Sequence, residues 1–148
     1  MNIRAGPMLA AITTLAACAT VGPDGGGPKP MAPCNQGICK VSVSVSKCVI
    51  ATPVPEPIPV NQKNVHIEWE LDFASWIAGN RFVDNDAITV PEGRGEFDQP
   101  EVSAGGRKLK LHDKNSLPGE HKYKYIIKVT SNVYGVCTPL DPFIVNQG

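Results

Sequence analysis

Four cysteines are spaced so that they could either bind a metal ion or form disulfide bonds: Cys34, Cys39, Cys48 and Cys137. Zinc sites use close ligand pairs such as CxxC or HxxxH, and neither spacing occurs here. An even number of cysteines favours disulfides in a chain that folds in an oxidising compartment. Three pairings exist for four cysteines. We favour Cys34–Cys39 with Cys48–Cys137, and the main alternative is Cys34–Cys48 with Cys39–Cys137.

Histidines and nearby carboxylates are a second set of residues with metal-binding chemistry. His112, Asp113, Glu120 and His121 lie in one turn-rich stretch, and they could hold a metal ion if that stretch folded back on itself. His66 lies on the polar side of an alternating segment. Because the spacing of the four residues matches no metal motif, we predict solvated loop side chains and no metal site.

Motifs for nucleophilic or phosphate chemistry are missing from the sequence. It contains no GxSxG segment, and no predicted helix follows Gly93 and Gly95 to form a phosphate site. Carboxylates are scattered over loops, as in any β-protein, so no acid–base pair can be assigned. The sequence therefore predicts a protein that is not an enzyme and carries no cofactor.

The charge balance argues against a nucleic-acid partner. Lys+Arg and Asp+Glu both number 14, so the formal net charge is zero and no basic footprint is present. Lysines on two predicted strands could form a patch for a polyanion such as lipopolysaccharide if the strands were neighbours, although such lysines more often keep sheet edges soluble. These lysines are Lys108, Lys110, Lys122, Lys124 and Lys128.

The first 17 residues have the pattern of an export signal. One positive charge in Met1–Arg4 precedes the apolar run Ala5–Ala17, whose length suits a signal peptide and is too short for a spanning helix. Leu15-Ala16-Ala17-Cys18 resembles the lipobox of bacterial lipoproteins. The resemblance implies cleavage before Cys18, a diacylglyceryl group on its sulfur, and acylation of the new amine, commonly with palmitate.

Two other interpretations of this segment stay open. Ala17-Cys18-Ala19 also fits an A-x-A cleavage site, which would release a soluble secreted protein beginning near Thr20. An apolar helix buried in the core is disfavoured by Gly6 and Pro7 at its start. For a lipoprotein, Ala19 in place of Asp favours the outer membrane of the cell envelope.

Two segments are rich in proline. Residues 18–33 contain the lipidation site followed by a Gly/Pro-rich run, which predicts a flexible linker. Residues 52–60 have proline at every second position, so they lack the N–H groups that a central strand needs. We predict a stiff surface crossover along a sheet edge, and the alternative is a ligand for a proline-binding groove.

The remaining sequence predicts β-structure. Apolar and polar residues alternate most clearly over 41–46, 65–71 and 122–130, and weaker strands are expected at 80–83, 87–90, 107–111 and 142–145. A single helical turn is expected at 72–78. Frequent turns and short connections predict an all-β fold over 34–148, a small antiparallel immunoglobulin-like sandwich linked by disulfides. The segment 141–146 also resembles the end of small uncharacterised secreted bacterial β-proteins, which implies no activity.

Together these features predict a non-enzymatic envelope lipoprotein with a binding or structural role. Its expected partners are the membrane, through the lipid anchor, and an envelope protein or polyanion. A second hypothesis is an inhibitor or immunity-type lipoprotein that blocks a hydrolase with loops such as 84–98. A third is a metal-binding or enzymatic β-domain built on His112, Asp113, Glu120 and His121.

Overall fold

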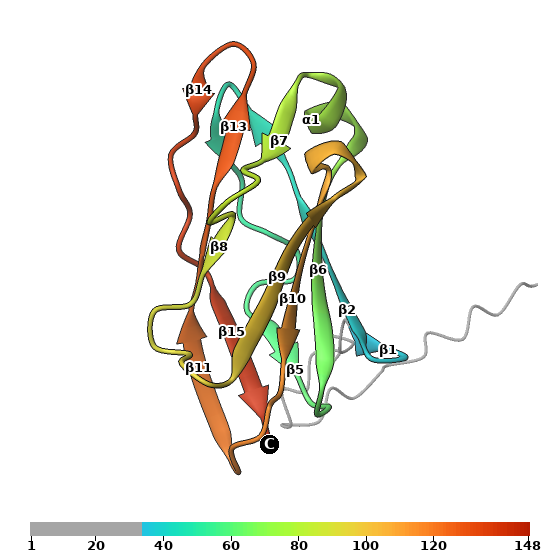
Figure 1. Cartoon of the computed structure of the whole chain (residues 1–148), viewed down its shortest axis with the longest axis vertical. Helices are drawn as coiled ribbons and strands as arrows, with labels where there is room; N and C mark the ends of the chain where they lie inside the picture. The colour runs from blue at the N-terminus through green and yellow to red at the C-terminus, as the bar shows by residue number, and fades with distance from the viewer. Residues whose placement is uncertain (1–33) are drawn as a thin grey trace, which may run out of the picture.

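The computed structural model describes residues 34–148, which fold into two packed β-layers with one short helix (Figure 1). The predicted signal peptide at 1–17, the lipidation site Cys18 and the linker at 18–33 lie outside the described residues. Among residues 34–148, no helix has the length and apolar character needed to cross a membrane.

The first layer is a five-stranded sheet in the order β1-β2-β6-β10-β9. Its strands are β1 (Cys34–Asn35), β2 (Ile38–Val43), β6 (Val65–Leu71), β10 (Lys108–Asp113) and β9 (Phe97–Ser103). The alternation in β6 places its apolar side chains inside, and every one of them is fully buried. Strand β9 is not among the predicted strands, and Pro100 lies in its middle. This proline is tolerated because β9 is an edge strand.

The second layer is built around residues 120–131, whose hydrogen-bonding partners change along their length. The strands within this segment are β11 (Glu120–Lys124), β12 (Ile126–Ile127) and β13 (Val129–Ser131). One side of the segment pairs with β14 (Gly135–Val136) and β15 (Phe143–Gln147). The other side pairs with β7 (Asn80–Phe82) and β8 (Ile88–Thr89). The predicted strand at 122–130 is therefore confirmed as three consecutive short strands.

Shorter elements complete the chain. They are the hairpin of β3 (Val45–Ser46) and β4 (Val49–Ile50), the edge strand β5 (Ile58–Val60), the helix α1 (Phe73–Ile77) and the 3-10 turn η1 (Ala104–Gly106). Strand β5 pairs with β15 at the edge of a three-stranded sheet. Residues 52–60 thus reach a sheet edge as predicted, but their last part is a strand with Ile58 and Val60 fully buried, so the surface crossover is confirmed only in part. The helical turn predicted at 72–78 is confirmed as α1.

The predicted all-β sandwich is confirmed, with one correction to the pairing. The order β2-β6-β10-β9 corresponds to strands A, B, E and D of an immunoglobulin-like sandwich, and the second layer supplies the strands of the other sheet. Pairing is not antiparallel throughout, because β2–β6 and β5–β15 are parallel ladders. Residues 44–64 connect β2 to β6 by crossing into the second layer, so no helix is needed to reverse the chain direction.

Both favoured cysteine pairs lie at disulfide distance in the structure. Cys34 pairs with Cys39 across the first hairpin, and Cys48 pairs with Cys137 over a sequence separation of 89 residues. Cys39 and Cys137 are buried in the core cluster. The second bond joins the β3–β4 turn to the residue that follows β14, and therefore connects two hairpins that are distant in sequence.

Trp69 occupies the centre of the core between the two layers. It is fully buried on β6, and its indole Nε1 donates to the Tyr125 hydroxyl at 3.3 Å. The two rings lie 5.3 Å apart in a tilted arrangement. Since Tyr125 belongs to the second layer, this contact joins the two layers, in agreement with the inward faces expected for 65–71 and 122–130.

Candidate binding surface

One end of the sandwich is formed by three loops from separate parts of the chain. Strands β2 and β6 are parallel, so both end on the same side of the sheet, where Val43 pairs with Leu71. Cys39 pairs with Ile67 nearer the other side, where β1 lies. Helix α1 follows Leu71, so it lies at the end remote from β1. Figure 1 shows α1, the β13–β14 hairpin and the start of β7 together at this end.

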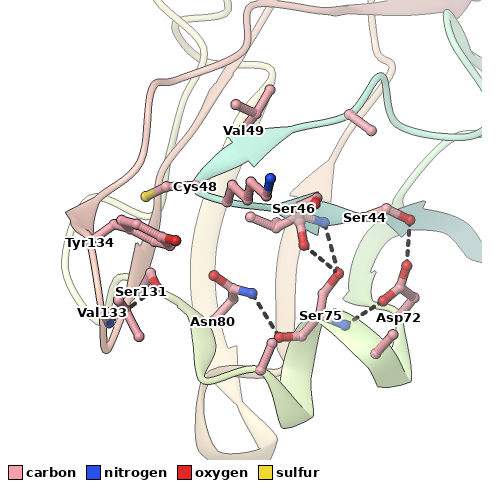
Figure 2. A pocket seen from close by; sticks show the side chains of 15 residues that line it. Ser44, Ser46, Cys48, Val49, Asp72, Ser75, Asn80, Ser131, Val133 and Tyr134 are labelled. Atoms are coloured by element: carbon pink, nitrogen blue, oxygen red, sulfur yellow. Dashed lines mark hydrogen bonds between the residues drawn. The ribbon is translucent and has the colours of Figure 1, made fainter.

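A pocket of about 560 Å³ opens between these loops (Figure 2). Its walls come from the β3–β4 hairpin, the α1 segment and the turn after β13. The lining residues whose roles matter below are Ser44, Cys48, Asp72, Ser75, Asn80 and Tyr134. A cavity of this size falls within the range of small-ligand pockets and of sites that accept one or two side chains of a partner.

Hydrogen bonds fix the polar side of the pocket. Asp72 caps α1 by accepting from the Ser75 backbone N–H at 2.7 Å, and it also accepts from the Ser44 hydroxyl. These bonds, led by that from Ser44, hold the pKa of Asp72 below its usual value. Asn80 donates through Nδ2 to the Ser75 carbonyl at 2.8 Å. The carboxylate of Asp72 and the side-chain amide of Asn80 therefore form hydrogen bonds within the protein that fix the pocket walls.

Exposed apolar side chains are frequent on the elements at this end of the sandwich, and three of them, Val49, Val133 and Tyr134, line the pocket. We call these six residues the loop-end surface: Val49, Phe73, Ile77, Val133, Tyr134 and Val136. Each is between 60% and 74% exposed, although exposed large apolar side chains are normally scattered singly. Figure 2 shows Tyr134 and Val133 on one side of the pocket and Val49 above it. Such clustering is typical of interaction sites.

Turn geometry and a disulfide hold the loop-end surface in place. The two residues of the β3–β4 turn, Lys47 and Cys48, both have positive φ angles of 49° and 62°, as a type I′ hairpin turn requires. Gly135 has a φ of 76° and permits the turn that projects Val133 and Tyr134. The Cys48–Cys137 bond then connects the two hairpins beside the pocket.

The side chains that line the pocket could bind another molecule by packing and hydrogen bonding. The Ser44 hydroxyl is bonded to Asp72, and Ser75 Oγ accepts from the Val45 N–H at 2.7 Å. The lining residues include no histidine that could activate a serine. A groove with satisfied polar walls and an apolar rim is suited to recognising another molecule.

The structure does not bring the four candidate metal ligands together. His112 binds Asp98 at 2.7 Å on the outer face of the first sheet, whereas Asp113 points into the core. His121 lies against the Pro118 carbonyl at 3.1 Å. Within residues 34–148, no three His, Cys, Asp or Glu side chains form a group that could hold a metal ion.

The lysines of the suggested basic patch do not form one surface. Strand β10, with Lys108, belongs to the first sheet, and β11, with Lys122 and Lys124, belongs to the second. Lys108 pairs with Glu68 at 3.1 Å, and Lys124 pairs with Asp141 at 2.5 Å. The strands are therefore not neighbours, which was the condition for a single polyanion patch.

The suggested inhibitory loop at 84–98 is anchored at its end. Glu96 is buried and accepts from both the backbone N–H and the hydroxyl of Ser116, at 2.7 and 2.5 Å. These bonds hold the pKa of Glu96 below its usual value against the opposing effect of burial. The last part of this loop is thus tied to the body of the domain.

Sequence reasoning missed the loop-end surface. Its members come from three loops, and only the pair Val133-Tyr134 beside Gly135 is a local signal, an apolar dipeptide at a hairpin turn. The fold and the pocket define a disulfide-linked β-sandwich with an apolar loop end. No protein-family model matches the chain, and no curated protein matches it.

Proposed function

We propose that this chain is a non-enzymatic envelope lipoprotein whose sandwich binds a partner protein through the loop-end surface. The observation that supports binding is a set of six exposed apolar side chains on the elements of one end, three of which line the pocket there. Aromatic and apolar residues of this kind form the centres of protein–protein interfaces. The lipobox resemblance at Cys18 supports the anchored location, which we place on the outer membrane.

The place where the sandwich begins, at residue 34, supports the same proposal. Residue 34 follows the linker and lies at the β1 end of the sandwich, whereas the loop-end surface lies at the other end (Figure 1). A lipid on Cys18 would therefore be attached to the end of the sandwich opposite the loop-end surface, which leaves that surface free for a partner. In immunoglobulin-like sandwiches, the loops at one end form the recognition surface of variable domains.

Replacing Cys18 by serine is expected to abolish lipidation and membrane association of the protein. The reason is that acyl chains supply the hydrophobic contact, about 0.8 kcal/mol for each buried methylene. The measurement is palmitate labelling with membrane fractionation of the wild type and Cys18→Ser in a bacterial host that processes lipoproteins. A soluble, unlabelled wild-type protein that begins near Thr20 would instead establish the secreted alternative.

A photo-reactive residue at position 134 is expected to cross-link to a discrete envelope protein, because Tyr134 lies on the loop-end surface. The matched control carries the same residue at position 117, since Leu117 is an exposed apolar residue in the turn near the C-terminus. We expect an adduct of defined mass from position 134 alone. Equal labelling from both positions, or none from position 134, contradicts the proposed surface.

The inhibitor hypothesis is a second candidate, favoured by the rigid construction of the same end. Two hairpins joined by Cys48–Cys137 project beside the pocket, and rigid loops suit insertion into an enzyme cleft. The cross-linked partner distinguishes the two functions. A hydrolase whose activity falls on adding the purified domain supports the inhibitor, whereas a partner without hydrolase activity supports the general binding role.

A further inference from the structure

Three amide and carboxyl side chains are enclosed between the two sheets, near the end where the described chain begins. Asp113 ends β10, Asn115 follows it, and Asn146 lies on β15. Their exposed fractions are 0%, 1% and 2%. Polar groups buried this completely are expected to have hydrogen-bond partners, because leaving one unpaired costs roughly 1–3 kcal/mol.

The hydrogen bonds in this cluster leave several buried oxygen atoms without a donor. Asp113 Oδ1 accepts from Asn146 Nδ2 at 3.0 Å and from the Asn115 backbone N–H at 2.9 Å. Asn115 Nδ2 donates to the carbonyls of Val60 and Gln62. Asp113 Oδ2 and Asn146 Oδ1 are both enclosed without a donor, and so is Asn115 Oδ1. The Asp113–Asn146 contact therefore has one hydrogen bond made and two unpaired oxygens.

A single proton completes this contact. A protonated carboxyl group can donate through one oxygen and accept through the other, which is the complement of a primary amide. We propose that, in mildly acidic solution, Asp113 is protonated in the folded protein and donates from Oδ2 to Asn146 Oδ1, forming a two-hydrogen-bond acid–amide pair that connects the two sheets. Asn146 is the acceptor rather than Asn115, because its amide already donates to the other oxygen of the same carboxyl group.

The electrostatic surroundings agree with this assignment. Burial raises the pKa of Asp113 to about 6, and the Glu96 carboxylate raises it further in the same direction. Hydrogen bonds from Asn146 and Asn115 and the charge of His112 act in the opposite direction. Burial raises the pKa of Tyr123 on β11, and the carboxylates of Glu96 and Asp113 raise it further. Lys114 turns away to Asp98 at 3.2 Å.

The pair makes the attachment of the C-terminal strand sensitive to pH. Asp113 belongs to the first sheet and Asn146 to the second, so the proton closes a bond between the layers. A carboxyl group with a raised folded pKa stabilises the fold fully below its unfolded pKa of 3.8, and this contribution is lost as the pH rises to about 6. Above that pH the carboxyl group is ionised, so Asp113 Oδ2 and Asn146 Oδ1 are both buried without a donor, which weakens the docking of β15.

The test is a carbon-13 NMR titration of the Asp113 carboxyl in the wild-type domain, together with hydrogen exchange of the β15 amides. We expect a titration midpoint between about 5 and 7, insensitive to calcium and to chelator. We also expect the opening constant of β15, corrected for intrinsic exchange, to rise about thirtyfold between pH 4 and 6. A midpoint below 4, or one that shifts with added cation, overturns the proposal.

Two variants complete the test. Asp113→Asn replaces the acid by an amide that keeps both hydrogen bonds without titrating, so the thirtyfold change is expected to disappear. Asp84→Asn is the matched control, because Asp84 is exposed on a loop, and it is expected to retain the full change. A pH dependence that persists in Asp113→Asn overturns the proposal, and the wild-type titration gives an independent answer if this variant does not fold.

Discussion

Removing the Cys48–Cys137 disulfide by double alanine substitution is expected to lower the free energy of unfolding by about 4 kcal/mol. The bond closes a loop with a sequence separation of 89 residues, so it strongly restricts the unfolded chain. The expectation rests on loop-closure entropy, which grows with the logarithm of loop length. The measurement is equilibrium denaturation in urea of the oxidised wild type and of Cys48→Ala/Cys137→Ala.

The other disulfide provides the control for this prediction. Cys34–Cys39 has a sequence separation of only 5 residues, so Cys34→Ala/Cys39→Ala is expected to cost about 2 kcal/mol. Because Cys48–Cys137 also joins the hairpins beside the pocket, only its removal is expected to abolish cross-linking from position 134. Equal losses of stability in the two double variants would show that loop length is not the governing factor.

Trp69→Ala is expected to destabilise the domain by about 4 kcal/mol. Trp69 is fully buried and contacts the other layer through Tyr125, so its removal leaves a large cavity and an unpaired hydroxyl. Trp69→Phe keeps an aromatic ring and loses the indole donor, so its cost is expected to fall to about half of that value. The measurement is again urea denaturation, followed by far-UV circular dichroism.

Trp76 supplies the comparison for Trp69. It is half-buried on α1, and its ring is stacked against the guanidinium groups of Arg81 and Arg107, at 5.1 and 5.6 Å from the ring centroid. Trp76→Ala removes less buried surface and is expected to cost about 1–2 kcal/mol. If Trp76→Ala proved as costly as Trp69→Ala, the core would not be centred on the Trp69–Tyr125 contact.

Local patterns predicted most of the strands because side chains alternate between the two faces of any strand. The alternation over 65–71 predicts which residues of β6 are buried without knowledge of the neighbouring strands. The same rule was available for Asp113, which continues the inward positions of Leu109 and Leu111. The predicted strand ends at 111 and the turn-rich stretch after it predicts a solvated Asp113, so the burial of Asp113 on β10 corrects this prediction.

The candidate site could not be predicted in the same way. Val49, Phe73 and Tyr134 come from three loops, and nothing in the local sequence of one loop indicates the position of another. The parallel pairing of β2 with β6 was also missed, because it depends on residues 44–64 crossing to the other layer. Both features are set by contacts between segments distant in the chain.

The sequence alone determined the class of fold, the inward faces of the main strands, the favoured disulfide pairs and the expectation of an exported, lipidated chain. These properties follow from short-range regularities such as alternation, turn residues and cysteine spacing. The tertiary structure alone decided that three loops meet around one pocket and that Asp113 meets Asn146 between the sheets. The physical reason is that burial and convergence result from packing the whole chain, whereas the periodicity of a strand is a local property of its backbone.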